Sequence, residues 1–333
     1  MRAGTPRRWA TIALAVIGLA LVAMPVVFDM FARAPKGAQM IQAFAPFMTN
    51  ARLNGYHAEM STIGGAVTDA PKVAQRLYAR APGSAQARFA TEYPTFVAFE
   101  REWHGIYPDM TGMIDTIQHN LGNYDAVAAL PSFTLFPWFF VIPGVIVLAL
   151  LGLGIMRRAR WRSVRWALVA LGLALVLAPA VFQMFSRAPK GGRMMTAFKT
   201  IETSGRVARI QGYFGEIAAG QGAVALELIP ALRRSGESAA EISTDYPGLT
   251  TFDAQWVHIL NDMTPMIGAM SDNVANYQAV AALPPFPPFP WFFVAPGLLV
   301  IGSATATGGG GRARGVRDAR MSDIHASQLE GVK

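Results

Sequence analysis

The sequence predicts an all-α membrane protein with four transmembrane helices, built as two tandem, parallel repeats of a span, a helical ectodomain and a second span. Three observations lead to this fold class. Only 15% of the 333 residues are charged and 52% are hydrophobic, whereas about 25% are charged in typical soluble proteins. Four apolar stretches approach the length of a membrane span. Residues 123–144 recur almost unchanged at 276–297, 153 positions later.

The four apolar stretches are each predicted to cross the membrane. A helix of about 20 predominantly apolar residues spans the hydrocarbon core of a bilayer. Three stretches reach this length without a charged residue, and the fourth reaches it only with the small residues that follow it. We therefore assign spans to residues 9–28, 136–156, 166–185 and 289–307. The first is expected to be an uncleaved anchor, because Pro35 follows the candidate signal-peptide cleavage site.

Basic residues set the predicted orientation. Arginines cluster before the first span, between the second and third, and after the fourth, and basic residues near spans stay on the cytoplasmic side. The terminus 1–8, the basic loop 157–165 and a disordered tail 308–333 are therefore expected in the cytoplasm. Segments 29–135 and 186–288 are expected to form two extracytoplasmic helical domains. The predicted location is the plasma (cytoplasmic) membrane of a bacterial envelope.

The net charge of +8 does not indicate nucleic-acid binding, because its distribution follows the membrane topology. The two long outer segments are close to neutral, and the basic excess lies in the cytoplasmic parts, where it faces anionic lipid head groups. The lipid bilayer is thus the predicted partner of these arginines. The chain contains no cysteine, which excludes disulfides, thiolate metal sites and cysteine nucleophiles.

Sequence matches along the whole chain indicate an internal duplication. Phe28–Gly37 returns as Phe182–Gly191 at an offset of 154. The pair Gly55-Tyr56 is matched to Gly212-Tyr213 at an offset of 157, which implies that the second copy gains three residues and later loses four. Because each copy contributes two spans in the same orientation, the copies are expected to be related by an axis along the membrane normal.

Each outer segment is predicted to be helical. Pro35 is expected to break the chain at residues 33–37, before a helix at 38–62. A short helix is expected at Pro71–Tyr78, between turns at Gly64 and Gly83.

A returning helix in each copy has an apolar seam with heptad spacing, which is typical of helices in bundles. Pro108 and Pro265 are expected to kink these two helices. The seam residues are Phe96, Phe99, Trp103, Ile106, Met110, Met113, Ile117 and Leu121 in the first copy, and Leu249, Phe252, Trp256, Ile259, Met263, Met266 and Met270 in the second.

Polar residues that match between the copies are candidate lipid-headgroup or structural positions. The main positions are Arg33, Lys36, Arg187, Lys190, Asp109 and Asp262, and Arg52/Arg206 and Glu59/Glu216 are further matched pairs. The four basic positions at 33, 36, 187 and 190 lie where the chain leaves the outer leaflet, a suitable place to hold lipid phosphates. The two aspartates are expected to cap the kinked helices.

The doubled motif supplies further membrane features. Trp138 and Trp291 are predicted interface anchors, because aromatic rings are favoured at the membrane surface. Pro143-Gly144 and Pro296-Gly297 fall inside the spans, where close packing against a neighbouring helix is expected.

No catalytic, cofactor or metal site is predicted. No nucleophile elbow, P-loop, dinucleotide fingerprint or histidine-ligand motif occurs in a supporting context. Methionines of the seam are candidates for Cu(I) binding, but core packing is preferred because the same seam carries phenylalanine, tryptophan and isoleucine. The spans contain no ionisable residue, which disfavours ion-coupled transport.

These observations favour a non-enzymatic scaffold, sensor or accessory subunit of an envelope complex, with ectodomain helices that bind a protein partner or a second copy. The alternative hypothesis is a transport component that passes a lipid or hydrophobic substrate between the two halves. A closed, well-packed interface between the copies would favour the scaffold, and an apolar groove leading into the spans would favour transport. Three or more convergent polar side chains in one cleft would revive an enzyme.

Overall fold

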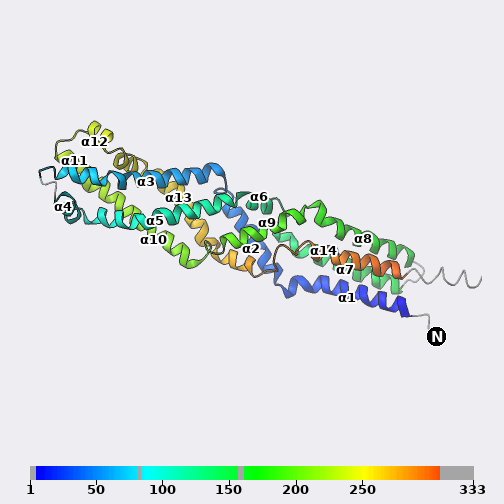
Figure 1. The fold of residues 1–333 in the computed structure, drawn as a ribbon. Helices are drawn as coiled ribbons and strands as arrows, with labels where there is room; N and C mark the ends of the chain where they lie inside the picture. Colours follow the sequence, from blue (N-terminus) through cyan, green and yellow to red (C-terminus); the bar gives the residue numbers. More distant parts are fainter. Residues whose placement is uncertain (1–4, 81–83, 157–160, 308–333) are drawn as a thin grey trace, which may run out of the picture. The chain divides into compact units, whose positions relative to one another are not determined.

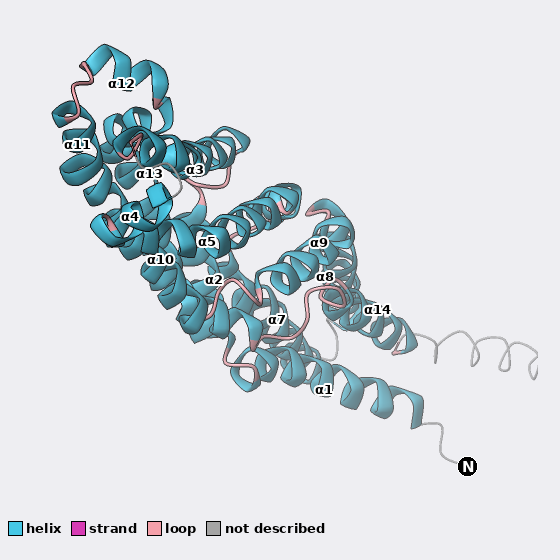
Figure 2. Cartoon of the chain, turned by 60° about the vertical axis from the view of Figure 1, so that its left-hand side comes forward, coloured by secondary structure: helices cyan, strands magenta, loops and turns pink. Residues whose placement is uncertain are grey.

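The all-α fold class is confirmed. The computed structural model describes residues 5–80, 84–156 and 161–307 (Figure 1). The structure is 87% helical, and its described part contains helices and loops but no strand (Figure 2). Predictions for the tail 308–333, for Gly83 and for residues 157–160 of the basic loop lie outside the described residues.

The chain forms two compact units, and each unit contains residues from both predicted copies. Unit 1 consists of residues 1–38, 126–192 and 279–333, and unit 2 consists of residues 39–125 and 193–278. Four helices carry residues of both units: α2 (Met30–Phe44), α6 (Leu121–Ala128), α9 (Met184–Phe198) and α13 (Pro247–Ala281).

Unit 1 contains the apolar helices α1 (Thr5–Val27), α7 (Phe136–Met156), α8 (Trp161–Val181) and α14 (Trp291–Ala306), with a short 3₁₀ turn, η2, at Phe133–Leu135. Helix α1 packs against α7 and α14, and α8 packs against the same two helices. Three segments are long and apolar enough to cross a membrane: Arg8–Val27, Phe133–Met156 and Trp161–Val181. Helix α8 begins at Trp161, so part of the predicted basic loop is helical.

The fourth apolar helix is shorter than the predicted span 289–307. Helix α14 has 16 residues, which at about 1.5 Å per residue covers about 24 Å of a hydrocarbon core of about 30 Å. Helix α14 begins only at Trp291, because the prolines among residues 284–290 cannot continue a helix. A fourth span therefore remains a prediction.

Glycines allow the apolar helices of unit 1 to approach closely, as predicted for the Pro-Gly pairs. A Cβ atom on Gly144 would lie 2.9 Å from the backbone oxygen of Gly18, and one on Gly297 would lie 2.7 Å from that of Gly172. Small residues at helix crossings let backbones pack together where no hydrophobic driving force is available. The expected close packing at Gly144 and Gly297 is confirmed.

The break predicted at residues 33–37 is wrong, because α2 continues through Pro35. The chain instead turns at Asp29 (φ 52°) and, between α8 and α9, at Gln183 (φ 54°). A left-handed residue of this kind ends the preceding helix. Helix α2 then stops at Phe44, shortly before Pro46, so the helix predicted at 38–62 is divided between α2 and α3 (Asn50–Leu77).

Unit 2 is built from long helices joined by short connections. In the first copy these are α3 (Asn50–Leu77), α4 (Ala85–Glu92) and α5 (Pro94–His119). In the second copy they are α10 (Ser204–Ala223), the π-helix η4 (Val224–Leu228), α11 (Ile229–Arg234) and α12 (Ala239–Asp245), followed by α13. Helix α5 packs against both α3 and α10.

The turn predicted at Gly64 is wrong, because α3 runs through Gly64, Gly65 and Pro71 without interruption. A Cβ atom on Gly65 would lie 3.1 Å from the Cα of Gly248, and one on Gly64 would lie 3.4 Å from the indole nitrogen of Trp103. These glycines therefore serve close packing rather than a turn, and the helix predicted at 71–78 is the end of α3.

The apolar seam forms the core of unit 2. All its residues are buried except Trp256, which is half-buried. Phe99 and Phe252, from the two copies, stack with ring centroids 6.3 Å apart. The five seam methionines are buried among these residues, in agreement with the preferred interpretation of core packing.

We predict that Gly144→Ala and Gly297→Ala destabilise the apolar bundle, because the new methyl group meets backbone that cannot yield. Overpacking of this kind costs about 1–3 kcal/mol. Thermal unfolding in detergent should show a lower melting temperature for each variant. Gly152→Ala is the matched control, because beyond the backbone of its own helix no described atom lies within 4 Å of its Cβ position. Unfolding at or above the wild-type temperature for Gly144→Ala would contradict the close approach.

Candidate functional site

Two arginine–aspartate ion pairs join the copies in unit 2. Arg52 of α3 donates from Nη1 to Oδ2 of Asp262 at 2.8 Å, and Arg206 of α10 donates from Nη1 to Oδ2 of Asp109 at 2.6 Å. Each arginine belongs to one copy and its aspartate to the other. The two pairs are therefore reciprocal.

Both arginines are placed by the same helix-capping arrangement. The hydroxyl of Thr49 accepts a hydrogen bond from the backbone N–H of Arg52, and the hydroxyl of Thr203 accepts one from that of Arg206, both at 3.2 Å. A threonine N-cap satisfies one of the unpaired N–H groups at the start of a helix. It also fixes the arginine in the first helical turn, from which its side chain reaches the other copy.

The expectation that Asp109 and Asp262 cap kinked helices is wrong. Helices α5 and α13 continue through Pro108 and Pro265. No helix begins at these positions, so there are no unpaired N–H groups for the aspartates to cap. The carboxylates face the arginines instead.

The Asp109 cluster is made of Asp109, Arg206 and Tyr213, and its arginine is more buried than that of the other pair. The side chain of Arg206 is 15% exposed, against 46% for Arg52. The hydroxyl of Tyr213 also donates to Asp109 Oδ2, at 2.7 Å. Burial alone would raise the pKa of Asp109, but the hydrogen bonds from Arg206 and Tyr213 hold it below its usual range. Asp109 is therefore a fully ionised structural carboxylate.

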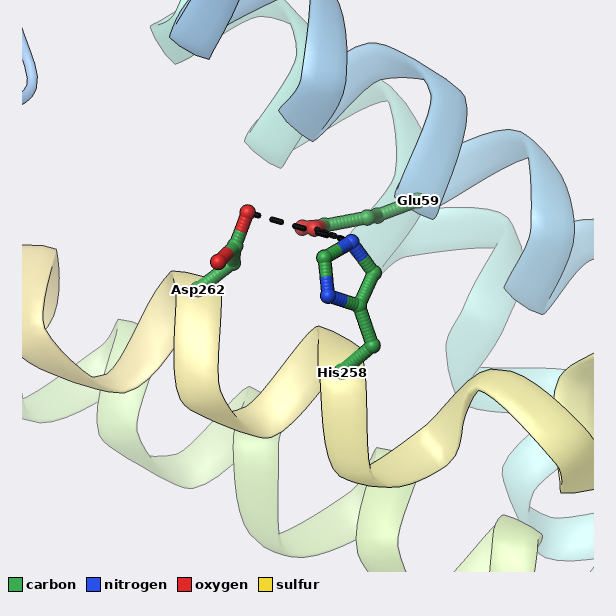
Figure 3. Close-up of side chains that lie close together, drawn as sticks. All are labelled: Glu59, His258 and Asp262. Atoms are coloured by element: carbon green, nitrogen blue, oxygen red, sulfur yellow. Dashed lines mark ion pairs between the residues drawn. The ribbon is translucent and has the colours of Figure 1, made fainter.

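The Asp262 cluster, made of Arg52, Glu59, His258 and Asp262, has a different composition. Glu59 lies on α3, and His258 and Asp262 lie one turn apart on α13, with the three side chains directed toward one another (Figure 3). His258 Nε2 lies 3.9 Å from Glu59 Oε1 and 4.0 Å from Asp262 Oδ2. These are the only three described residues that form a group of histidine and carboxylate ligand atoms within 4.8 Å of one another.

Glu59 is the unusual member of this cluster. Its side chain is 6% exposed, and its Oε2 atom has no hydrogen-bond partner among the described residues. Burial, and then the charge of Asp262, raise the pKa of Glu59 to about 7. Burial also raises the pKa of the neighbouring Tyr56 to about 12. A buried carboxyl group without a partner is costly, so this position invites a proton or a cation.

The contacts identify which residues of the two copies correspond. Thr49 and Arg52 match Thr203 and Arg206 at an offset of 154, and the same offset pairs Glu59 with Tyr213. Glu216, which the sequence match had paired with Glu59, is exposed. The second copy thus has a phenol where the first has a carboxyl group.

Glu202 is a second buried acid in unit 2. It lines a cavity of about 30 Å³ together with apolar and aromatic residues of both copies, among them Phe44, Phe198, Tyr124 and Tyr277. Its Oε2 atom has no partner among the described residues, and burial raises its pKa to about 8. At the matched position the first copy has Met48. The cavity has room for about one water molecule.

The four basic positions predicted near the membrane surface lie in unit 1. Arg33 donates to the backbone oxygen of Ala282 at 3.1 Å, and Arg187 donates to that of Ala129 at 2.6 Å. These are again reciprocal contacts between the copies. Lys36 and Lys190 are half-buried, and their predicted role at lipid phosphates stays a prediction.

The predicted interface anchors are exposed tryptophans of unit 1. Trp138 is 48% exposed and Trp291 is 58% exposed. Each makes an edge-to-face contact with a phenylalanine of its own copy, Trp138 with Phe31 and Trp291 with Phe185. Their placement at a membrane surface stays a prediction.

Sequence reasoning did not find the Asp262 cluster. One signal was available, because His258 and Asp262 are four residues apart and so share a helix face. Glu59 lies on α3, which is far from α13 in the sequence. Its position beside His258 and Asp262 depends on how the two helices pack, and no local sequence pattern predicts that packing.

We predict that Arg206→Met lowers the free energy of unfolding by about 2 kcal/mol, because it removes a largely buried guanidinium that donates to both the side chain and the backbone oxygen of Asp109. Arg52→Met should cost about 0–1 kcal/mol, since the Arg52 side chain is nearly half exposed. Denaturant titration of both variants in the same detergent measures the difference. Equal losses would contradict a stronger contribution from the more buried arginine.

We also predict a pH-dependent stability that depends on Glu202. Its pKa is about 8 in the folded protein, above the ordinary value of 4.5. Between these values the folded state holds a proton that the unfolded state has lost, so stability falls as pH rises. Glu202→Met, which copies Met48, should lose part of this slope between pH 5 and 8. Glu216→Gln is the exposed control. An unchanged slope in Glu202→Met would contradict the assignment.

The chain matches no protein-family model, no curated protein and no solved structure in the three comparisons made with known proteins. No membership of a family follows from them. The residues and contacts described above are therefore the basis for any statement about function.

Proposed function

We propose that the protein is a non-enzymatic membrane scaffold, sensor or accessory subunit, with helical segments outside the membrane that bind a protein partner. The observation that carries this proposal is the set of contacts that link the two predicted copies in unit 2. The reciprocal ion pairs of Arg52 and Arg206 and the stacked rings of Phe99 and Phe252 join the copies. The cavity at Glu202 holds about 30 Å³, far less than a lipid or other hydrophobic substrate requires.

The proposal includes a duplicated, four-span architecture. Contacts at matched positions support it: Gly18 approaches Gly144 as Gly172 approaches Gly297, and the Arg33–Ala282 contact has its counterpart in Arg187–Ala129. In this proposal the short helix α14 crosses with its flanking residues, both termini lie in the cytoplasm, and the membrane is the plasma membrane.

Single-cysteine labelling tests this topology directly, because the natural chain has no cysteine. We expect a membrane-impermeant maleimide to label His104→Cys and Val257→Cys in intact cells, and Ser163→Cys and Ser322→Cys only after permeabilisation. The residues at 104 and 257 occupy matched positions of the two copies. Labelling of Ser322→Cys in intact cells would show that α14 does not cross and would contradict the four-span proposal.

The alternative function is a transport component for a lipid or hydrophobic substrate. One observation favours it: an apolar groove of about 560 Å³ lies between α1 and α14 in unit 1, with Val16, Met24, Trp291 and Leu299 among its lining residues. The polar side chains of the Asp262 cluster keep an enzyme as a third hypothesis, although the cluster itself has no serine, threonine or cysteine nucleophile.

Purification of the tagged protein at native level in mild detergent separates these functions. The scaffold proposal expects a protein partner at fixed stoichiometry. Large exposed apolar side chains of unit 2 are candidate contacts, so Leu226→Asp or Val257→Asp should release the partner without lowering the melting temperature; these side chains are 79% and 67% exposed. Glu216→Gln is a surface control. Enriched lipid without a protein partner would favour transport and contradict the scaffold.

A further inference from the structure

We propose that Glu59, His258 and Asp262 form a binding site for one divalent transition-metal cation of the Zn²⁺ or Mn²⁺ type. This site goes beyond the scaffold function and does not depend on it. An imidazole nitrogen with two carboxylate oxygens is a ligand set that suits such ions, whereas Mg²⁺ and Ca²⁺ prefer oxygen ligands alone.

The geometry places the three ligand atoms around one point. His258 Nε2 lies 3.9 Å and 4.0 Å from the nearest oxygens of Glu59 and Asp262. Metal–ligand distances of about 2.0–2.2 Å require these atoms to approach one another by about half an ångström. The His258 side chain is 67% exposed, so rotation of its ring supplies this movement without disturbing the core.

Glu59 supplies an independent indication of a ligand. Its side chain is more than nine-tenths buried and points toward the other two residues (Figure 3). Its Oε2 atom has no hydrogen-bond partner in the described part of the chain. Desolvation of a carboxylate without a partner is unfavourable, and a bound cation compensates for it more fully than a neutral donor.

Arg52 holds the site in place and balances its charge. It donates to Asp262 at 2.8 Å, and the remaining lone pairs of that carboxylate can still bind a metal. Hydrogen bonds of this kind orient metal ligands. Two carboxylates and one guanidinium give a net charge of about −1, which favours a divalent cation. Three protein ligands leave a coordination position for water or a partner's side chain.

The matched position in the other copy lacks this ligand set. Tyr213 stands where Glu59 would be, and Gly105 stands where His258 would be, at offsets of 154 and 153. The chain should therefore bind one ion, and the Asp109 cluster provides an internal comparison.

The test is a titration of the full chain in detergent with Zn²⁺ or Mn²⁺ after treatment with a chelator, using an affinity tag without histidine. Isothermal calorimetry should give one ion per chain, and Co²⁺ should give visible bands of nitrogen and oxygen coordination. Glu59→Gln and His258→Ala should weaken binding at least about tenfold. The metal should raise the melting temperature of the wild type but not of His258→Ala.

Controls separate this site from incidental binding. Tyr213→Phe, and His57→Ala at the exposed His57–Asp115 pair, should leave affinity unchanged. The variant Gly105→His with Tyr213→Glu builds the same ligand set around Asp109 and should bind a second ion. Absence of saturable binding would overturn the proposal and leave a shared proton between Glu59 and Asp262. Binding that survives both Glu59→Gln and His258→Ala would overturn it as well.

Discussion

The Arg206–Asp109 ion pair links the two predicted copies within unit 2. Asp109 lies inside a continuous helix and is partly buried, so it requires donors from elsewhere. Arg206 and Tyr213 supply them from the other copy, and Arg206 is positioned by the Thr203 cap. Arg52 and Asp262 repeat this exchange in the opposite direction. The stacked rings of Phe99 and Phe252 likewise link the two predicted copies.

Reciprocal contacts between the predicted copies also occur in unit 1. Arg33 and Arg187 each donate to a backbone oxygen of the other copy, and glycine pairs allow the apolar helices to approach closely. In each unit, contacts between the two predicted copies occur in pairs, and each contact has a counterpart at the matched positions.

The side chains with candidate chemical roles lie at positions where the two predicted copies differ. Glu59 and Tyr213, Glu202 and Met48, and His258 and Gly105 are matched positions with different side chains. Each difference places a carboxyl group or an imidazole in one predicted copy only. The second copy also contains the π-helix at 224–228, which has no counterpart in α3; π-helical turns are rare and are frequent at functional sites. The structural framework is shared, and the candidate metal site is not.

Much of the architecture could be predicted from sequence, because it follows from strong local patterns. The apolar helices at the first three stretches, the heptad seam and the packing at Gly144 are examples. The failures have a common cause. Gly64, Pro35 and Asp109 were interpreted through local rules for turns, breaks and caps, whereas packing against distant residues decides their roles. The Asp262 cluster was missed for the same reason, since α3 and α13 meet only in three dimensions.

A double-mutant cycle on Arg206 and Asp109 measures the interaction between the two predicted copies most directly. It uses Arg206→Met, Asp109→Asn and the double variant. The free energy of unfolding of the four proteins gives the coupling between the two side chains. If the copies are joined as described, the coupling energy should be about 1–3 kcal/mol. A coupling near zero would show that the two residues act independently, and it would contradict this link between the two predicted copies.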